Sequence, residues 1–219
     1  MQEIAFIFSL AILILSIVLH EVSHGYVANI LGDKTAALAG RLTLNPIKHI
    51  DPLGSIILPA LLFLSPSPIL FGWAKPVPYN PYNLKGGKWG PGLVAFAGPG
   101  TNLLIAFVFA VLLRAGLITG EALFLAALIV YVNIMLAFFN LIPFPPLDGS
   151  KVLASLLPNR AYMRWWRPFE ASVTQLGLVG TFLLIMIFFS VLLPFFSGFI
   201  NATFVFFVSP EVAAIFYSS

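Results

Sequence analysis

Residues 20–24 read His20-Glu21-Val22-Ser23-His24 and stand near the end of an otherwise apolar N-terminal run. On a helix, His20 and His24 lie on one face, one turn apart, so both imidazoles can reach a single ion. Glu21 lies beside them, and a carboxylate there can accept a proton from metal-activated water, the role that the H-E-x-x-H pattern assigns to its Glu. We expect the rest of the chain to fold around this stretch.

The composition is that of a membrane protein. The chain has 219 residues, of which 60% are hydrophobic and 9% are charged, against roughly 25% charged residues in an average soluble domain. An all-α, polytopic protein embedded in a lipid bilayer is therefore expected, and nucleic acid is not an expected partner. Because the chain contains no Cys, disulfides, thiolate ligands and a cysteine nucleophile are excluded. Any metal must use His and carboxylate ligands.

Four stretches are long and apolar enough to span a membrane as helices, namely residues 4–31, 93–113, 121–141 and 175–193. The apolar segment 195–208 is short and suits an interface, which gives about four to five membrane helices in total. Residues 35–44 predict a small membrane-associated β-hairpin or a loop. Seventeen Pro and seventeen Gly favour broken and re-entrant segments, which survive at membrane depth only inside protein or beside a wet cavity.

The charge distribution predicts a topology. Pro residues interrupt the apolar stretch 55–71, which makes it a poor spanning helix. If this stretch crossed the membrane, the basic residues would divide seven and four between the two sides. If it dips in and returns, ten of the eleven share one side and only Arg114 lies on the other. The positive-inside rule favours the second arrangement, with a re-entrant segment and an extracytoplasmic N-terminus. Helices 4–31 and 121–141 then run in the same direction, toward the cytoplasmic face.

Asp148 is the candidate third ligand, because three Pro residues must unwind the helix of 121–141 just before it. A catalytic zinc site uses three protein ligands and one open position, and two imidazoles with one carboxylate are an established set. The alternative is that Asp148 serves only as a helix N-cap. Counted back from Leu31, His24 lies about 10 Å from its helix end, so the metal would sit inside the membrane near one face.

The other polar residues considered for a functional role are Asn102, Asn140 and His49. Asn102 and Asn140 could hydrogen-bond a substrate carbonyl or an oxyanion, or they could satisfy the backbone of broken helices. The two interpretations carry equal weight. His49 lies in a polar loop and is expected to be solvated.

Three separated motifs occur in order within about residues 15–155: His20-Glu21-Val22-Ser23-His24, then Asn45-Pro46 with Asp51-Pro52-Leu53-Gly54, then Asn140-x-x-Pro143-x-Pro145-Pro146-Leu147-Asp148-Gly149. Together they resemble the site-2 protease family of intramembrane zinc metalloproteases. The resemblance implies one zinc ion per chain, bound by His20, His24 and Asp148, with Glu21 as general base. It also implies that Asn140 helps to bind substrate or to stabilise the transition state. Without room for a PDZ-like or CBS domain, the chain is expected to be a minimal member.

The expected activity is hydrolysis of peptide bonds within or near transmembrane segments of membrane proteins, as in regulated intramembrane proteolysis. A single domain is expected over residues 1–219, with a catalytic core at about 4–157 and a helical extension at 175–208. The small size fits a multi-pass protein of a prokaryotic plasma membrane, with its active site toward the cytoplasmic face. The competing class is a non-catalytic zinc-binding membrane adaptor or a metal transporter. A transporter needs polar residues along a path through the bilayer, and an adaptor has no need of Glu21.

Overall fold

The computed structural model describes residues 2–57 and 74–218, and within them every regular element is a helix. Among the described residues, three helices are long and apolar enough to cross a membrane: α1 (Gln2–Ile30), α4 (Trp89–Arg114) and α5 (Glu121–Leu141). Large apolar side chains on their outer faces, such as Leu104 and Phe107, are exposed. Exposed apolar surface of this extent suits contact with lipid. The predicted all-α membrane fold is confirmed.

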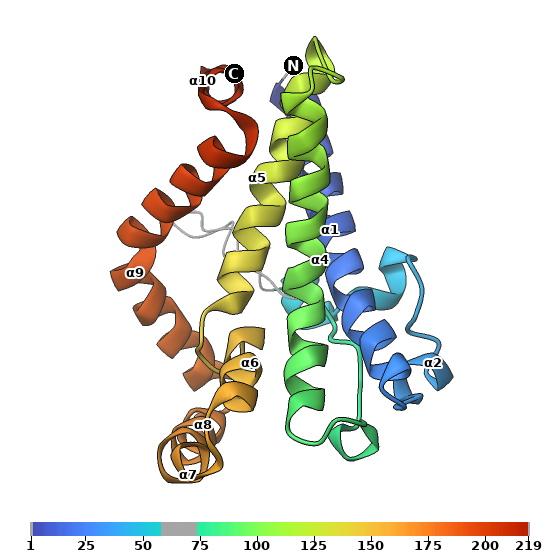
Figure 1. The fold of residues 1–219 in the computed structure, drawn as a ribbon, viewed down its shortest axis with the longest axis vertical. Helices are drawn as coiled ribbons and strands as arrows, with labels where there is room; N and C mark the ends of the chain where they lie inside the picture. The colour runs from blue at the N-terminus through green and yellow to red at the C-terminus, as the bar shows by residue number, and fades with distance from the viewer. Residues whose placement is uncertain (1, 58–73, 219) are drawn as a thin grey trace.

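Helix α4 packs against both α1 and α5 (Figure 1). Helices α1 and α5 run in the same direction and α4 runs in the opposite one, as the charge distribution predicted. The α4–α5 contact is lined by small buried residues, among them Ala106, Ala110 and Ala127. Because lipid tails are as apolar as these side chains, close van der Waals packing is what holds such helices together.

The C-terminal part differs from the prediction. Residues 175–193 and 195–208 were expected as two segments, but the structure forms one helix of 32 residues, α9 (Gly177–Val208). Proline within the stretch does not end the helix, because membrane helices tolerate Pro where neighbouring groups satisfy the freed backbone. The short helix α10 (Pro210–Ser218) follows, and both helices pack against α5. Phe204 of α9 is fully buried in that contact.

Residues 35–57 contain no β-hairpin. Thr35–Leu38 forms the short helix α2, a loop follows, and two further short helices complete the stretch, η1 (Pro46–His49) and η2 (Pro52–Ile57). Of the two forms predicted for residues 35–44, the hairpin is therefore wrong. The Asn45 side chain accepts a hydrogen bond from the Ile47 N–H and caps η1, which is how Asn-Pro begins a helical turn.

The chain before and after residues 58–73 lies at the same end of the bundle. The Lys75 N–H donates to the His49 carbonyl at 2.8 Å, and Arg41 Nη2 donates to the Lys75 carbonyl at 2.8 Å. Most of the stretch predicted to re-enter the membrane, 55–71, lies outside the described residues, so re-entry stays a prediction. Arg114 ends α4 at the end of the bundle opposite to α2 and α6 (Figure 1).

Asp33 ties the end of α1 to the segment that leads into α4. Its fully buried carboxylate accepts hydrogen bonds from the Thr35 hydroxyl, the Asn80 N–H and Asn83 Nδ2. Burial raises the pKa of Asp33, but these hydrogen bonds outweigh burial and hold that pKa below its usual range. The 3-10 turn η3 (Pro81–Asn83) is thereby fixed against the end of α1.

Helix α5 ends at Leu141, as predicted, and an irregular turn with a cis Pro145–Pro146 bond carries the chain back to α6 (Asp148–Leu156). A Cβ on Gly149 would lie 2.2 Å from the Leu141 carbonyl oxygen. Only glycine therefore lets the first turn of α6 press against the end of α5, and this contact sets the position of Asp148. Beyond α6 the chain forms α7 (Asn159–Ala161), η4 (Tyr162–Trp166) and α8 (Arg167–Gln175).

Candidate metal centre

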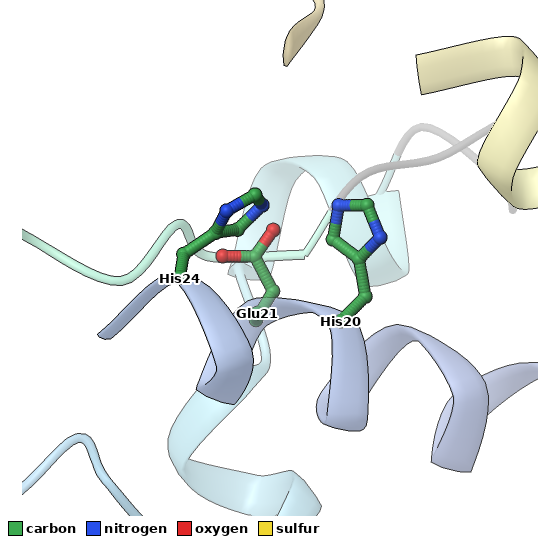
Figure 2. A group of neighbouring side chains, drawn as sticks. All are labelled: His20, Glu21 and His24. Carbon is green, nitrogen blue, oxygen red and sulfur yellow. The ribbon is translucent and has the colours of Figure 1, made fainter. Parts of the chain in front are cut away.

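His20 and His24 project from the same side of α1, with Glu21 between them (Figure 2). The ring centroids of the two imidazoles are 4.7 Å apart, and both side chains are buried. The i and i+4 spacing on a regular helix produces this arrangement, as the sequence predicted.

Each imidazole contacts an oxygen of α4 through Nδ1. His24 Nδ1 lies 2.7 Å from the Val94 carbonyl oxygen, and His20 Nδ1 lies 2.5 Å from Asn102 Oδ1. A backbone carbonyl can only accept, so Nδ1 of His24 carries the proton and its Nε2 keeps a lone pair. Histidine ligands are commonly oriented in this way, with the ring nitrogen that does not bind metal donating to an oxygen.

Asp148 brings a third donor atom to the same point. Its Oδ2 lies 3.1 Å from His20 Nε2 and 3.3 Å from His24 Nε2. Tetrahedral zinc ligands at roughly 2.0–2.1 Å from the ion lie about 3.3 Å from one another. Both distances from Asp148 Oδ2 are thus close to the spacing of two zinc ligands. The N-cap alternative is not seen, because the N-cap of α6 is Leu147 and no side chain caps that helix end.

Gly98 of α4 leaves room beside these donor atoms. A Cβ at this position would lie 2.5 Å from both His20 Nε2 and His24 Nε2. Any side chain here would collide with the Nε2 atoms of both imidazoles. Two imidazoles and a carboxylate are a donor set that fits a zinc ion.

Glu21 is held differently from Asp148. One of its carboxylate oxygens lies within 4.8 Å of a ligand nitrogen of each histidine, so His20, Glu21 and His24 by themselves also form a group that could hold a metal ion. Its Oε2 accepts the Val77 N–H at 3.0 Å. Val77 belongs to the extended segment of residues 74–79, whose backbone Arg41 also holds. The half-buried Glu21 is therefore held in place beside the two histidines by the Val77 N–H.

The structure places the other three candidates, Asn102, Asn140 and His49, in different surroundings. Asn102 is fully buried and hydrogen-bonds His20, so its amide does not face a surface that a substrate could reach. The half-buried Asn140 donates to the Leu136 carbonyl of its own helix at 2.9 Å, which matches the backbone interpretation. The expectation for His49 is wrong, because this residue is 2% exposed and its Nε2 lies 2.8 Å from the Thr43 carbonyl.

Two residues of the site were missed by sequence reasoning. Gly98 looks like any small residue of an apolar helix, and nothing in its local pattern distinguishes it. Asn133 is fully buried in α5 and reaches the site through Asn102. The sequence did contain a signal for Asn133, namely an amide side chain in the middle of an apolar helix. Burying a polar group inside a membrane costs free energy, so such a residue is taken as functional by default.

Comparison with known proteins agrees with this geometry. Residues 115–188 match peptidase family M50. Over 156 residues the chain is 40% identical to "Putative zinc metalloprotease YwhC" of Bacillus subtilis, covering 67% of each protein. It is 31% identical over 150 residues to "Putative zinc metalloprotease Rip2" of Mycolicibacterium smegmatis, covering 68% of this chain and 56% of Rip2. No solved structure matches the chain significantly. The chain thus belongs to peptidase family M50, the site-2 protease family.

Proposed function

We propose that this protein is a zinc endopeptidase that hydrolyses peptide bonds within or near the transmembrane segments of membrane-protein substrates. One observation carries the proposal. His20 Nε2 and His24 Nε2 lie 3.1 and 3.3 Å from Asp148 Oδ2, on or beside helices long and apolar enough to span a bilayer. Histidine and carboxylate oxygen are ligands that suit zinc. We assign the ligand role to these three residues and the general-base role to Glu21.

When bound, zinc supplies Lewis-acid chemistry, which acidifies water and polarises a carbonyl group. Glu21 moves the proton. Val77 N–H holds the carboxylate through Oε2, and we assign to Oε1 the role of accepting a proton from the attacking water as the water oxygen bonds to the carbonyl carbon. The same atom returns this proton to the amine nitrogen as the carbon–nitrogen bond breaks. A helical substrate must be unwound locally first, since its carbonyls are engaged in i to i+4 hydrogen bonds.

The end of the bundle that carries α2 and α6 would face the cytoplasm. Lys34, Arg41, Lys75 and Lys151 all belong to segments at this end, whereas Arg114 lies at the other. The positive-inside rule then orients the protein in a plasma membrane with the metal nearer the cytoplasmic side. Membrane-embedded peptide and water can both approach a site at that depth.

The test compares wild type with Glu21→Gln on single-span substrates, while bound zinc is measured in both proteins. Gln keeps the shape of Glu but cannot take up a proton, so cleavage should fall by at least about 100-fold with zinc retained. Glu121→Gln, an exposed substitution at the start of α5, is the matched control and should cleave normally. Equal cleavage by wild type and Glu21→Gln would reject the proposal. Zinc binding without cleavage by any of the three proteins would support an adaptor instead.

A further inference from the structure

A chain of buried hydrogen bonds runs from Asn133 of α5 to His20 of α1. Asn133 Oδ1 accepts from Asn102 Nδ2 at 2.7 Å, and Asn102 Oδ1 lies 2.5 Å from His20 Nδ1. We propose that Asn133 is a positioning residue that sets metal affinity by fixing the orientation of the Asn102 amide and, through it, the tautomer of His20. The inference rests on the proposed metal site.

One backbone carbonyl determines which group donates and which accepts in each of these hydrogen bonds. Asn133 Nδ2 lies 2.9 Å from the carbonyl oxygen of Ile129, which can only accept, so the amine side of Asn133 must face it. Its Oδ1 is then turned toward Asn102 and requires a donor. Asn102 must present Nδ2 to Asn133 and Oδ1 to His20. His20 consequently carries a proton on Nδ1, and Nε2, which lies 3.1 Å from Asp148 Oδ2, is the nitrogen left to bind the metal.

Burial makes this orientation matter. Asn133 and Asn102 are both 0% exposed, so water cannot replace a missing partner. Without Asn133, the Asn102 Nδ2 keeps only its 3.5 Å contact with the Ser16 carbonyl, which is weaker than the 2.7 Å bond to Asn133. The Asn102 amide can then rotate more readily to present Nδ2 to His20. An amide N–H that faces His20 Nδ1 favours the other tautomer of His20, in which Nε2 bears the proton and cannot bind metal. Ser16 completes the arrangement, since its Oγ accepts from Asn133 Nδ2 at 2.9 Å.

The structure contains a matched control for simple helix packing. Thr101 Oγ1 donates to Ser23 Oγ at 2.8 Å and also joins α4 to α1, one residue from Asn102. This bond has no link to either imidazole among the contacts that the structure describes. If the buried amides only held helices together, removing the Thr101 bond would weaken metal binding about as much as removing Asn133.

The experiment uses the full chain in detergent and measures zinc affinity by competition with a chelating dye. Asn133→Leu, which keeps the number of side-chain atoms, should lower zinc affinity by about 10- to 100-fold, the usual effect of losing an outer partner of a metal ligand. Thr101→Val should change it by less than about 3-fold. Adding Asn102→Asp to Asn133→Leu should restore binding, because a carboxylate can only accept and therefore fixes the His20 proton on Nδ1.

A second readout needs no metal. With only three His in the chain, nitrogen-15 spectra of histidine-labelled, zinc-free protein can report the His20 tautomer. We expect protonated Nδ1 in wild type and a mixture in Asn133→Leu. Unchanged affinity and tautomer in Asn133→Leu, or an equal loss in Thr101→Val, would overturn the inference. Failure of wild type to bind zinc would instead reject the proposed function, and the tautomer would still decide the role of Asn133.

Discussion

Replacing Gly98 with alanine adds one methyl group beside the proposed metal position. The new Cβ would lie 2.5 Å from His20 Nε2 and 2.5 Å from His24 Nε2, and 2.6 Å from His24 Cε1. Ordinary contacts of a Cβ begin at 3.4 Å, so each ring would have to retreat by roughly 0.9 Å in a closely packed interior. The Nδ1 hydrogen bonds to Val94 and Asn102 oppose that retreat.

The displacement is several times larger than a metal site tolerates, because ligand distances must hold to about 0.2 Å. Zinc affinity should fall by at least about 100-fold, or roughly 2.7 kcal/mol. Folding should not suffer equally, because alanine in a helix interior is favoured over glycine by about 1 kcal/mol. Gly98→Ala is therefore expected to lose metal and activity while α4 stays formed.

The assay measures zinc per chain, zinc affinity and thermal unfolding in detergent. Gly100→Ala is the control in the same helix, since the nearest atoms that its Cβ would meet belong to the ring of Phe96, at 3.2 Å, and Phe96 is 46% exposed. A chelator should lower the unfolding temperature of wild type and Gly100→Ala but not that of Gly98→Ala, which holds no zinc to lose. Normal zinc affinity in Gly98→Ala would refute this account of the site.

Three further predictions concern the groups around the centre. Asp148→Ala should remove a ligand and lower zinc content at neutral pH, measured by metal analysis. Gly149→Ala should reduce zinc affinity with His20 and His24 intact, because its Cβ would collide with the Leu141 carbonyl and displace α6. Asp33→Ala should cost about 1.5–3 kcal/mol of stability in thermal unfolding, as hydrogen bonds to a charged group are lost. Because the pKa of Asp33 is lowered in the folded protein, its contribution to the free energy of unfolding is complete above the ordinary aspartate pKa of about 4. This contribution is lost as the pH falls below that value. The wild-type advantage over Asp33→Ala should therefore vanish in acid, and a constant difference would contradict this.

The sequence predicted what short-range spacing can encode. The i, i+4 pair His20 and His24 faces one point because α1 is regular, and α5 ends at Leu141 because Pro residues follow. Charge placement predicted that α1 and α5 run in parallel. Those two facts sufficed to predict Asp148 near the histidines, and the structure places it 3.1 and 3.3 Å from their Nε2 atoms.

What could not be predicted depends on packing between distant segments. Gly98 and Asn133 matter only because α4 lies against α1 and α5, and helices apolar on all sides carry no periodicity that reveals which face meets which neighbour. His49 was expected in solvent because its neighbours in sequence are polar, yet it is buried, with its ring near the Thr43 carbonyl and its own carbonyl bound by the Lys75 N–H. The continuity of α9 likewise depends on its surroundings rather than on local propensity.

The most direct test of the central claim is zinc X-ray absorption spectroscopy on the purified wild-type protein, with zinc counted per chain. We predict one zinc ion with two imidazole nitrogens and oxygen ligands at about 2.0–2.1 Å, and loss of that signal in His20→Ala. Protein that cleaves its substrate without zinc, or zinc bound by three imidazoles including that of His49, would contradict the assignment of His20, His24 and Asp148.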